Sequence, residues 1–235
     1  NPWHSNSKMK TIIAPFCSLL LLTPLACAKP NFVFILADDM GYGDVSHAGG
    51  KIPTPNLDKL RAEGMRFTDA HTTSSVCTPT RYGILTGRYN WRSPLKQHVL
   101  FPPQRSIMDP KRLTVAGFLK DRGYQSCVIG KWHLGLGDGK TPVDWNGDVK
   151  PGPLEVGFDY SFLLPSTNDR VPCVYVENHR VLNLDPADPL FVGKKKPVGF
   201  EGTIYPDGRT HPEAMTYYAS SHGHNNSVIN GIGRI

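Results

Sequence analysis

The pattern of apolar and polar residues predicts strands alternating with helices in the N-terminal part of the chain. Residues 31–37 (NFVFILA) form an uninterrupted apolar run after Pro30, which is typical of a strand buried on both faces within a parallel sheet. Two further strands are predicted, by alternation in residues 65–70 (MRFTDA) and by the apolar run in residues 125–129 (QSCVI).

Three helices are predicted between these strands. The first begins at Pro55 after a Thr54 cap and stops at Gly64, and the other two span residues 79–85 and 114–122. Strands and helices in this order indicate an α/β domain with a mainly parallel sheet between layers of helices.

The sequence changes character after residue 130, where Gly, Pro, Asp and Asn become frequent up to residue 153. A hairpin is predicted within residues 172–184, turning near Asn178. No internal repeat and no linker divides the rest into domains. The final residues, 228–235 (VINGIGRI), begin an element without finishing it, so we expect the domain to be truncated before its C-terminal half.

The N-terminal segment has the order of a secretory signal peptide. Met9 and Lys10 precede an apolar stretch of residues 12–25, and small residues follow up to Ala28, where we expect cleavage. The stretch is shorter than the roughly 20 apolar residues of a membrane-spanning helix and contains prolines, so no stable span is expected. We therefore expect export to the periplasm or outside the cell and divide the chain into upstream flanking sequence (1–8), signal peptide (9–28) and incomplete domain (29–235).

Composition excludes two classes of protein. Charged residues make up 20% and apolar residues 39% of the 235 residues, which is the composition of a folded domain and not of a disordered chain. The net charge is +6, but the basic residues are scattered apart from residues 194–196, which read as a solvated loop. Nucleic-acid binding is therefore not expected.

Three cysteines remain after the expected cleavage, namely Cys77, Cys127 and Cys173. An odd number in an exported protein leaves at least one thiol that is unpaired, intermolecular or chemically special. No C-x-x-C pair is present, which argues against a zinc ribbon or a thioredoxin-type site.

Polar residues at predicted strand ends are candidates for chemistry, because ligands of open α/β sheets bind there. Asp38 and Asp39 follow the first strand. Their mutual repulsion is relieved by a hard cation, Ca²⁺ or Mg²⁺, although a helix cap or a solvated turn is an alternative interpretation. Cys77 precedes a helix whose N-terminus would activate a thiol, with Arg81 one turn further on, although a buried structural thiol has a similar pattern.

Several segments together resemble signatures of the type I sulfatases. Residues 77–81 (CTPTR) and 85–88 (LTGR) resemble the first family signature, C-x-P-x-R-x3-L-T-G-R. Residues 123–126 (GYQS) and 130–135 (GKWHLG) resemble the second, and residues 31–41 resemble the opening strand with its metal-binding aspartates. The agreement of ordered motifs is more specific than any one of them alone.

The resemblance implies an alkaline-phosphatase-like sulfatase fold and a nucleophile made from Cys77. In that family the motif cysteine is oxidised to formylglycine by a maturation enzyme, and its hydrated aldehyde attacks a sulfate ester. By resemblance, Asp38, Asp39 and the modified Cys77 would hold Ca²⁺, with Mg²⁺ less expected, and Arg81 would favour the ionised diol.

The resemblance also implies roles for two residues after the third predicted strand. Lys131 would neutralise sulfate oxygens in the transition state, and His133 would bond the diol and help to return its proton. The implied substrate is a sulfated small molecule or a sulfated carbohydrate. Its specificity is expected to lie on loops, and the candidate contacts are Trp145, Asp169, Arg170 and Arg180.

Two alternatives remain open on the sequence. Phosphodiesterases and phosphonate hydrolases of the same superfamily share the metal-assisted attack on a tetrahedral oxyanion. The chain also lacks the later Asp-Asn pair that completes the calcium site in that family, since residues 168–169 have the reverse order. An inactive, truncated binding remnant is therefore the second alternative.

Overall fold

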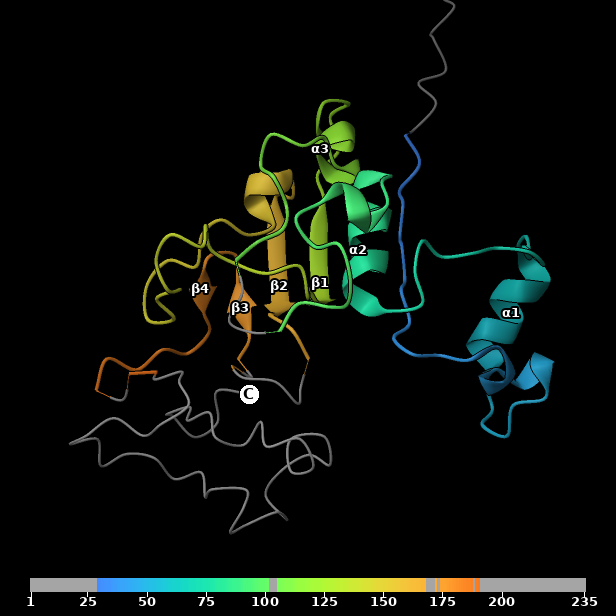
Figure 1. Cartoon of the computed structure of the whole chain (residues 1–235). Helices are drawn as coiled ribbons and strands as arrows, with labels where there is room; N and C mark the ends of the chain where they lie inside the picture. The colour runs from blue at the N-terminus through green and yellow to red at the C-terminus, as the bar shows by residue number, and fades with distance from the viewer. Residues whose placement is uncertain (1–28, 102–104, 168–171, 173, 188, 191–235) are drawn as a thin grey trace, which may run out of the picture.

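The structure is a computed structural model that describes residues 29–101, 105–167, 172, 174–187 and 189–190 (Figure 1). The expected signal peptide, Cys173, the pair Asp169 and Arg170, and the lysine run at 194–196 lie outside the described residues. None of the described helices combines the length and apolarity that crossing a membrane requires.

The centre of the described fold is a four-stranded sheet in the order β1-β2-β3-β4. Its strands are β1 (Cys127–Lys131), β2 (Tyr160–Leu164), β3 (Val176–Glu177) and β4 (Arg180–Val181). The β1–β2 pair is parallel, whereas β3 and β4 are added antiparallel to form the predicted hairpin. Asn178 lies in the turn at φ 54°, a left-handed conformation that Asn tolerates better than most residues.

The parallel pair fixes the direction of the sheet and brings two strand ends together. Lys131 at the end of β1 is in register with Leu164 at the end of β2. Backbone pairing continues past the strands, because the N–H groups of Trp132 and His133 donate to the carbonyls of Leu164 and Pro165 at 2.9 and 3.0 Å. Strand β1 was expected two residues earlier, and β2 was not expected.

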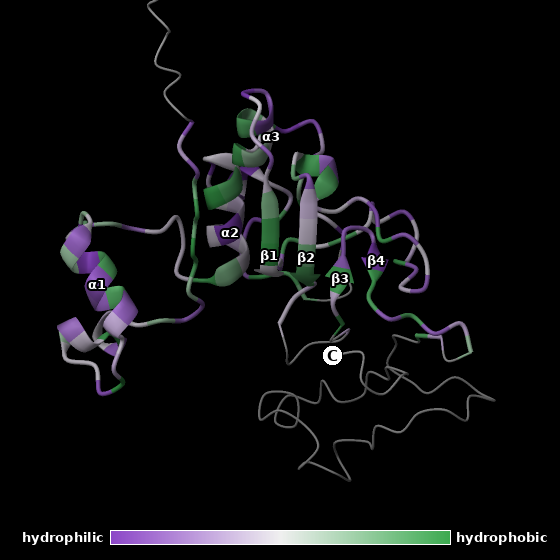
Figure 2. Cartoon of the chain, turned by 180° about the vertical axis from the view of Figure 1, so that it is seen from behind, coloured by the Kyte–Doolittle hydropathy of each residue, from purple (hydrophilic) through white to green (hydrophobic). Residues whose placement is uncertain are grey.

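The three predicted helices are confirmed as α1 (Pro55–Glu63), α2 (Cys77–Thr86) and α3 (Val115–Lys120). Helix α2 ends at Gly87, whose φ of 64° suits a residue without a side chain, and Thr114 caps α3 by accepting from the Gly117 N–H at 3.1 Å. In both ribbon views α2 and α3 lie beside β1, while α1 stands apart at the end of two long connections (Figures 1 and 2). Short 3₁₀ helices occupy Tyr42–Asp44, Ser46–Ala48, Asn90–Arg92 and Leu154–Val156.

The core lies on β2, the hairpin and the segment that follows β1. Trp132, Leu134 and Leu163 are fully buried, and the ring of Phe158 packs edge-on against Trp132 with centroids 6.4 Å apart. This core fixes the backbone immediately after Lys131, where the sequence placed candidate site residues.

The predictions of a buried strand at residues 31–37 and of a second strand at residues 65–70 are wrong for the described structure. Both segments are extended or irregular without strand pairing, and Val33 and Ile35 are 85% and 82% exposed. The first segment nevertheless runs alongside α2 as a hydrophobic trace (Figure 2). An apolar run shows a preference for burial, but a strand also needs a partner backbone, and the described residues supply none here.

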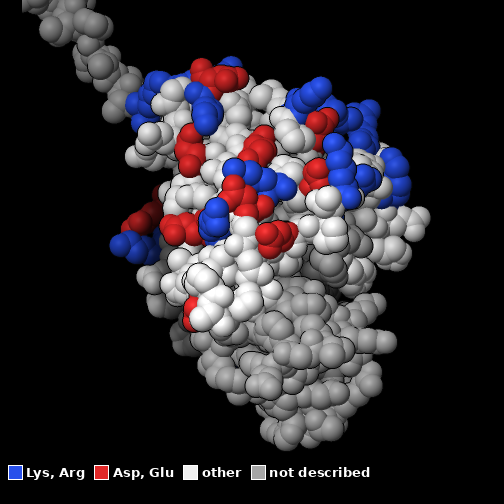
Figure 3. Space-filling view, turned by 90° about the vertical axis from the view of Figure 1, so that its left-hand side faces the viewer, with Lys and Arg blue, Asp and Glu red and all other residues white. Residues whose placement is uncertain are grey.

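Charges on the face shown in Figure 3 are of mixed sign. Lysine and arginine side chains are interspersed with aspartates and glutamates over the described part of this face. Among the described residues, Asp148 pairs with Lys150 at 3.0 Å and with Arg180 at 2.9 Å.

Candidate active site

Residues from three separate segments meet at the end of β1. Asp38 ends the extended N-terminal segment, Arg81 lies on α2, and Lys131 is the last residue of β1. The Asp38 Oδ2 atom lies 2.7 Å from Lys131 Nζ and 3.5 Å from Arg81 Nη2. The structure therefore brings these three predicted site residues into one charged cluster.

Arg81 is held in this cluster by a hydrogen bond to the backbone as well as by its ion pair. Its Nη1 donates to the Lys131 carbonyl at 2.6 Å, and its side chain is only 14% exposed. Burial lowers the pKa of the guanidinium, while the negative charges of Asp38 and Cys77 act in the opposite direction. The buried Nε of Arg81 has no hydrogen-bond partner in the described part of the chain, so this guanidinium retains an unused donor.

The carboxyl of Asp38 has a lowered pKa because of its neighbours. Burial alone would raise the pKa of its carboxyl, but the hydrogen bond from Lys131 and the positive charges of Lys131 and Arg81 outweigh burial and hold the pKa below its ordinary value. An ionised carboxylate is the form that binds a hard cation.

Cys77 is the first residue of α2 and lies at the N-terminus of this helix. It is a partly exposed free thiol. The next residue, Thr78, is fully buried; its Oγ1 donates to the His133 carbonyl at 2.9 Å and accepts from the Leu100 N–H at 3.2 Å. Thr78 thus ties the start of α2 to the segment after β1.

His133 is buried beside this tie. It is 1% exposed, adopts φ 53°, and its Nε2 lies 2.8 Å from the Leu100 carbonyl. Because a carbonyl can only accept, Nε2 carries the proton in this contact. Leu100 was missed by sequence reasoning, since a backbone carbonyl that orients a histidine has no side-chain signature.

Asp39 differs from Asp38 in its contacts. It has a φ of 54°, and its carboxylate makes no hydrogen bond or ion pair with any residue that the structure describes. Asp38 and Asp39 have the oxygen ligands that Ca²⁺ prefers, but no group of three or more His, Cys, Asp or Glu side chains in the described ranges is arranged to hold a metal. Among the described residues, these two carboxylates alone would supply only part of a site for a hard cation.

Two of the candidate substrate contacts, Trp145 and Arg180, lie among the described residues. Trp145 lies in a turn, but its side chain is 8% exposed and packs in the hydrophobic core, so it presents little surface to a substrate. The guanidinium of Arg180 forms an ion pair with Asp148 on the surface. Of the other cysteines, Cys127 is an exposed free thiol on β1.

Comparison with known proteins places this geometry in a family. Residues 30–222 match the family model described as Sulfatase. An N-acetylgalactosamine-6-O-sulfatase from Bacteroides thetaiotaomicron is 46% identical over 210 residues, which cover 88% of this chain and 39% of that protein. Human arylsulfatase A is 41% identical over 157 residues, covering 66% of this chain and 29% of that protein.

A solved structure agrees with these sequence relatives. It comes from work on the metabolism of multiple glycosaminoglycans by Bacteroides thetaiotaomicron, and it matches with a TM-score of 0.71 and 45% identity. The match covers 79% of this chain and 38% of that chain. The chain thus spans about two fifths or less of the length of the proteins that it resembles.

Proposed function

The chain belongs to the sulfatase family, and from this membership we propose that it hydrolyses sulfate esters through a formylglycine made from Cys77. The observation that carries the proposal is the meeting of the Cys77 helix terminus with the Arg81 and Lys131 cations at one strand end. Such a cluster suits an anionic tetrahedral substrate. The alkaline-phosphatase-like fold follows from the family and from the solved relative.

The reaction of a hydrated aldehyde, which has two hydroxyls on one carbon, explains why a cysteine would be oxidised at this position. One hydroxyl of the hydrated aldehyde attacks the sulfur of the ester, and the alcohol leaves with a proton. The second hydroxyl then loses its proton, the C=O bond re-forms, and the C–O bond to sulfate breaks, which releases sulfate. Water adds to the aldehyde again and regenerates the diol. The proposed partner is accordingly a maturation enzyme that converts Cys77.

The cations would stabilise charge as the S–O bond breaks. The ammonium of Lys131 would neutralise sulfate oxygens, and the guanidinium of Arg81, with its unused Nε donor, would orient the ionised diol. Because the Nε2 proton of His133 is donated to the Leu100 carbonyl, proton exchange with the diol would use Nδ1.

Calcium is the proposed cofactor, in preference to Mg²⁺. Asp38 and Asp39 would hold it together with an oxygen of the modified Cys77, and the bound cation would lower the energy of negative charge on that oxygen. Ca²⁺ takes about six to eight oxygen ligands, so further donors are needed beyond these residues.

A sulfated carbohydrate is the proposed substrate. The bacterial relative that covers 88% of this chain is named for a sulfated amino sugar, and this supports a carbohydrate over other sulfate esters. Export to the periplasm or outside the cell is likewise proposed, on the pattern of residues 9–28.

Parallel assays test this proposal against its nearest rival. The protein, produced together with the maturation enzyme and supplied with Ca²⁺, is offered an aryl sulfate and an aryl phosphodiester. We expect sulfate release to dominate and to vanish in Cys77→Ala. Preferred cleavage of the phosphodiester would favour the phosphodiesterase alternative, and cleavage of neither would favour a binding remnant.

A further inference from the structure

The hydroxyl of Thr78 belongs to a closed cycle of three hydrogen bonds next to the candidate nucleophile. Thr78 Oγ1 donates to the His133 carbonyl at 2.9 Å, and the Nε2–H of His133 donates to the Leu100 carbonyl at 2.8 Å. The Leu100 N–H closes the cycle by donating to Thr78 Oγ1 at 3.2 Å. The first sulfatase signature leaves position 78 open, so the motif itself gives this side chain no role.

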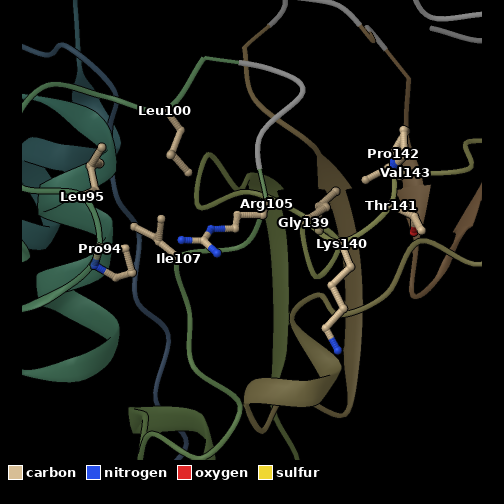
Figure 4. A pocket seen from close by; sticks show the side chains of 11 residues that line it. Pro94, Leu95, Leu100, Arg105, Ile107, Gly139, Lys140, Thr141, Pro142 and Val143 are labelled. Carbon is tan, nitrogen blue, oxygen red and sulfur yellow. The ribbon is translucent and has the colours of Figure 1, made fainter.

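The three residues of this cycle lie in the interior of the described fold. Thr78, Leu100 and His133 are 0%, 6% and 1% exposed. The side chain of Leu100 lies among the apolar residues that line a pocket, including Leu95 and Ile107 (Figure 4). Because a buried donor or acceptor without a partner is costly, the three hydrogen bonds hold one another in place.

The cycle holds His133 by its backbone and by its ring. The φ of His133 is 53°, a left-handed conformation that is uncommon for residues other than glycine. Its N–H donates to the Pro165 carbonyl at 3.0 Å, while its own carbonyl accepts from Thr78. The Leu100 carbonyl fixes the ring, because a carbonyl accepts only from a nitrogen that carries a proton. Nδ1 is then the ring atom assigned to proton exchange with the diol.

We propose that Thr78 is a positioning residue for the sulfatase reaction: its hydroxyl sets the Leu100 carbonyl, which keeps the proton of neutral His133 on Nε2. The proposal rests on the proposed sulfatase function and adds a residue that acts through His133. Since Thr78 directly follows Cys77 in α2, it joins the nucleophile to the histidine that exchanges its proton. A displacement of about 1 Å in such an arrangement lowers a rate by up to about 100-fold.

The protonation of the His133 ring tests the cycle without turnover. The protein is produced without the maturation enzyme and with isotopically labelled histidine, and the His133 ring signals are identified by nuclear magnetic resonance from their absence in His133→Gln. At a pH where the ring is neutral, we expect protonation at Nε2 alone in the unaltered protein and in Thr78→Ser, which keeps the hydroxyl. Thr78→Val has nearly the same shape but no hydroxyl, and it should show both tautomers.

Two results of this measurement would overturn the proposal. One is a His133 ring that carries its proton on Nδ1, wholly or in part, in the unaltered protein. The other is a ring protonated at Nε2 alone in Thr78→Val. Thr78→Ala, which also lacks the hydroxyl, takes the place of Thr78→Val if that variant does not fold.

Steady-state kinetics on the matured protein separate positioning from substrate binding. In Thr78→Val we expect kcat for an aryl sulfate to fall by about 10- to 100-fold, the range for loss of a group that orients a reacting side chain, with KM nearly unchanged. Thr78→Ser should keep most of the rate because it retains the hydroxyl. Each kcat is divided by the fraction of residue 77 that peptide mass analysis finds converted, so that incomplete maturation is not counted as slow catalysis.

Thr114→Val is the matched control for the loss of a buried hydroxyl. Thr114 is 2% exposed and caps α3; its Oγ1 donates to the Val156 carbonyl and accepts from the Gly117 N–H. This variant should lower the melting temperature, yet keep kcat and the His133 tautomer. An unchanged kcat in Thr78→Val, or an equal loss in both valine variants, would overturn the proposal. Lack of sulfate release by the unaltered protein would instead count against the proposed function, while the ring measurement still decides the cycle.

Discussion

At the scale of single residues, Lys131 connects the fold to the candidate chemistry through both its backbone and its side chain. Its carbonyl accepts from Arg81, and its ammonium pairs with Asp38. As the last residue of β1, it is held by the parallel pairing with Leu164. The strand thus places two cations and one carboxylate around the same point.

The Lys131→Ala variant tests the role of the ammonium. Removing one positioned donor that stabilises transition-state charge typically lowers kcat by about 100- to 1,000-fold. We expect a loss of this size with an aryl sulfate, with a melting temperature close to that of the unaltered protein. Lys111→Ala, at an exposed position, is the matched control and should keep full activity. A loss of less than about tenfold would contradict the role.

Asp39 is predicted to serve the metal and not the fold. Because its carboxylate contacts no described residue, Asp39→Ala should leave thermal stability nearly unchanged. Sulfate release in the presence of Ca²⁺ should nevertheless be abolished, since a hard oxygen ligand is lost. Rates and thermal melts of the two proteins provide the measurement. Activity that persists in the variant at low Ca²⁺ would exclude Asp39 as a ligand.

At the scale of elements, local signals predicted helices better than strands. The Pro55 start and the Gly64 and Gly87 stops are encoded within a few residues, so α1 and α2 could be located from the sequence. The pairing of a strand, in contrast, depends on backbone from segments that are distant in the sequence. Residues 31–37 have the stronger apolar pattern but are unpaired, whereas the unexpected β2 pairs with two neighbours.

The same distinction applies to the candidate site. Side chains in motifs, such as Arg81 and Lys131, could be identified from the sequence, and the structure brings them together. The connections through Thr78 and Leu100 could not, because they run through backbone groups between segments 22 residues apart in sequence. Tertiary packing alone creates such contacts.

Helix α2 is predicted to depend on the absence of a side chain at Gly83. A Cβ there would overlap the Thr73 side chain, whose β-branched shape cannot move aside easily. We expect overpacking in Gly83→Ala to lower the free energy of unfolding by about 1–3 kcal/mol. This loss exceeds the stabilisation that alanine gains over glycine from its higher helix propensity. Gly43→Ala, whose added Cβ meets open space, is the control for denaturant unfolding. Equal stability of both variants would refute the overlap.

Asp159 is predicted to link elements in a pH-dependent way. Its carboxylate accepts from Lys120 on α3, at 2.8 Å, and from the Ser126 N–H before β1, at 2.9 Å. These contacts hold the pKa of Asp159 below its ordinary value of 3.8. Because the folded pKa is lowered, the stabilisation is present above that value and is lost as the pH falls through the folded pKa.

The Asp159→Asn variant should therefore lose less stability on acidification than the unaltered protein. Asparagine keeps an acceptor oxygen but cannot be protonated in this range. Thermal melts between about pH 6 and about pH 2 give the comparison. If the melting temperatures of the two proteins fell in parallel with pH, Asp159 would contribute nothing to the pH dependence of stability.

At the scale of the whole molecule, the described residues form a four-stranded sheet with the charged candidate cluster at the end of β1. The core beneath β2 and the hairpin is well packed, whereas residues 32–36 leave a continuous apolar segment exposed. The cluster of Asp38, Arg81 and Lys131 lies where that segment meets the end of β1. The arrangement concentrates the candidate site residues at one place in the described fold.

The most direct test of a sulfatase nucleophile is the mass of the peptide that contains residue 77. The protein is produced with and without the maturation enzyme and digested, and the peptides bearing Cys77 and Cys127 are compared. We predict that the peptide with residue 77 loses the thiol and gains an aldehyde only when the enzyme is present, while the Cys127 peptide keeps its thiol. An unmodified thiol at residue 77 under these conditions would contradict the proposed mechanism.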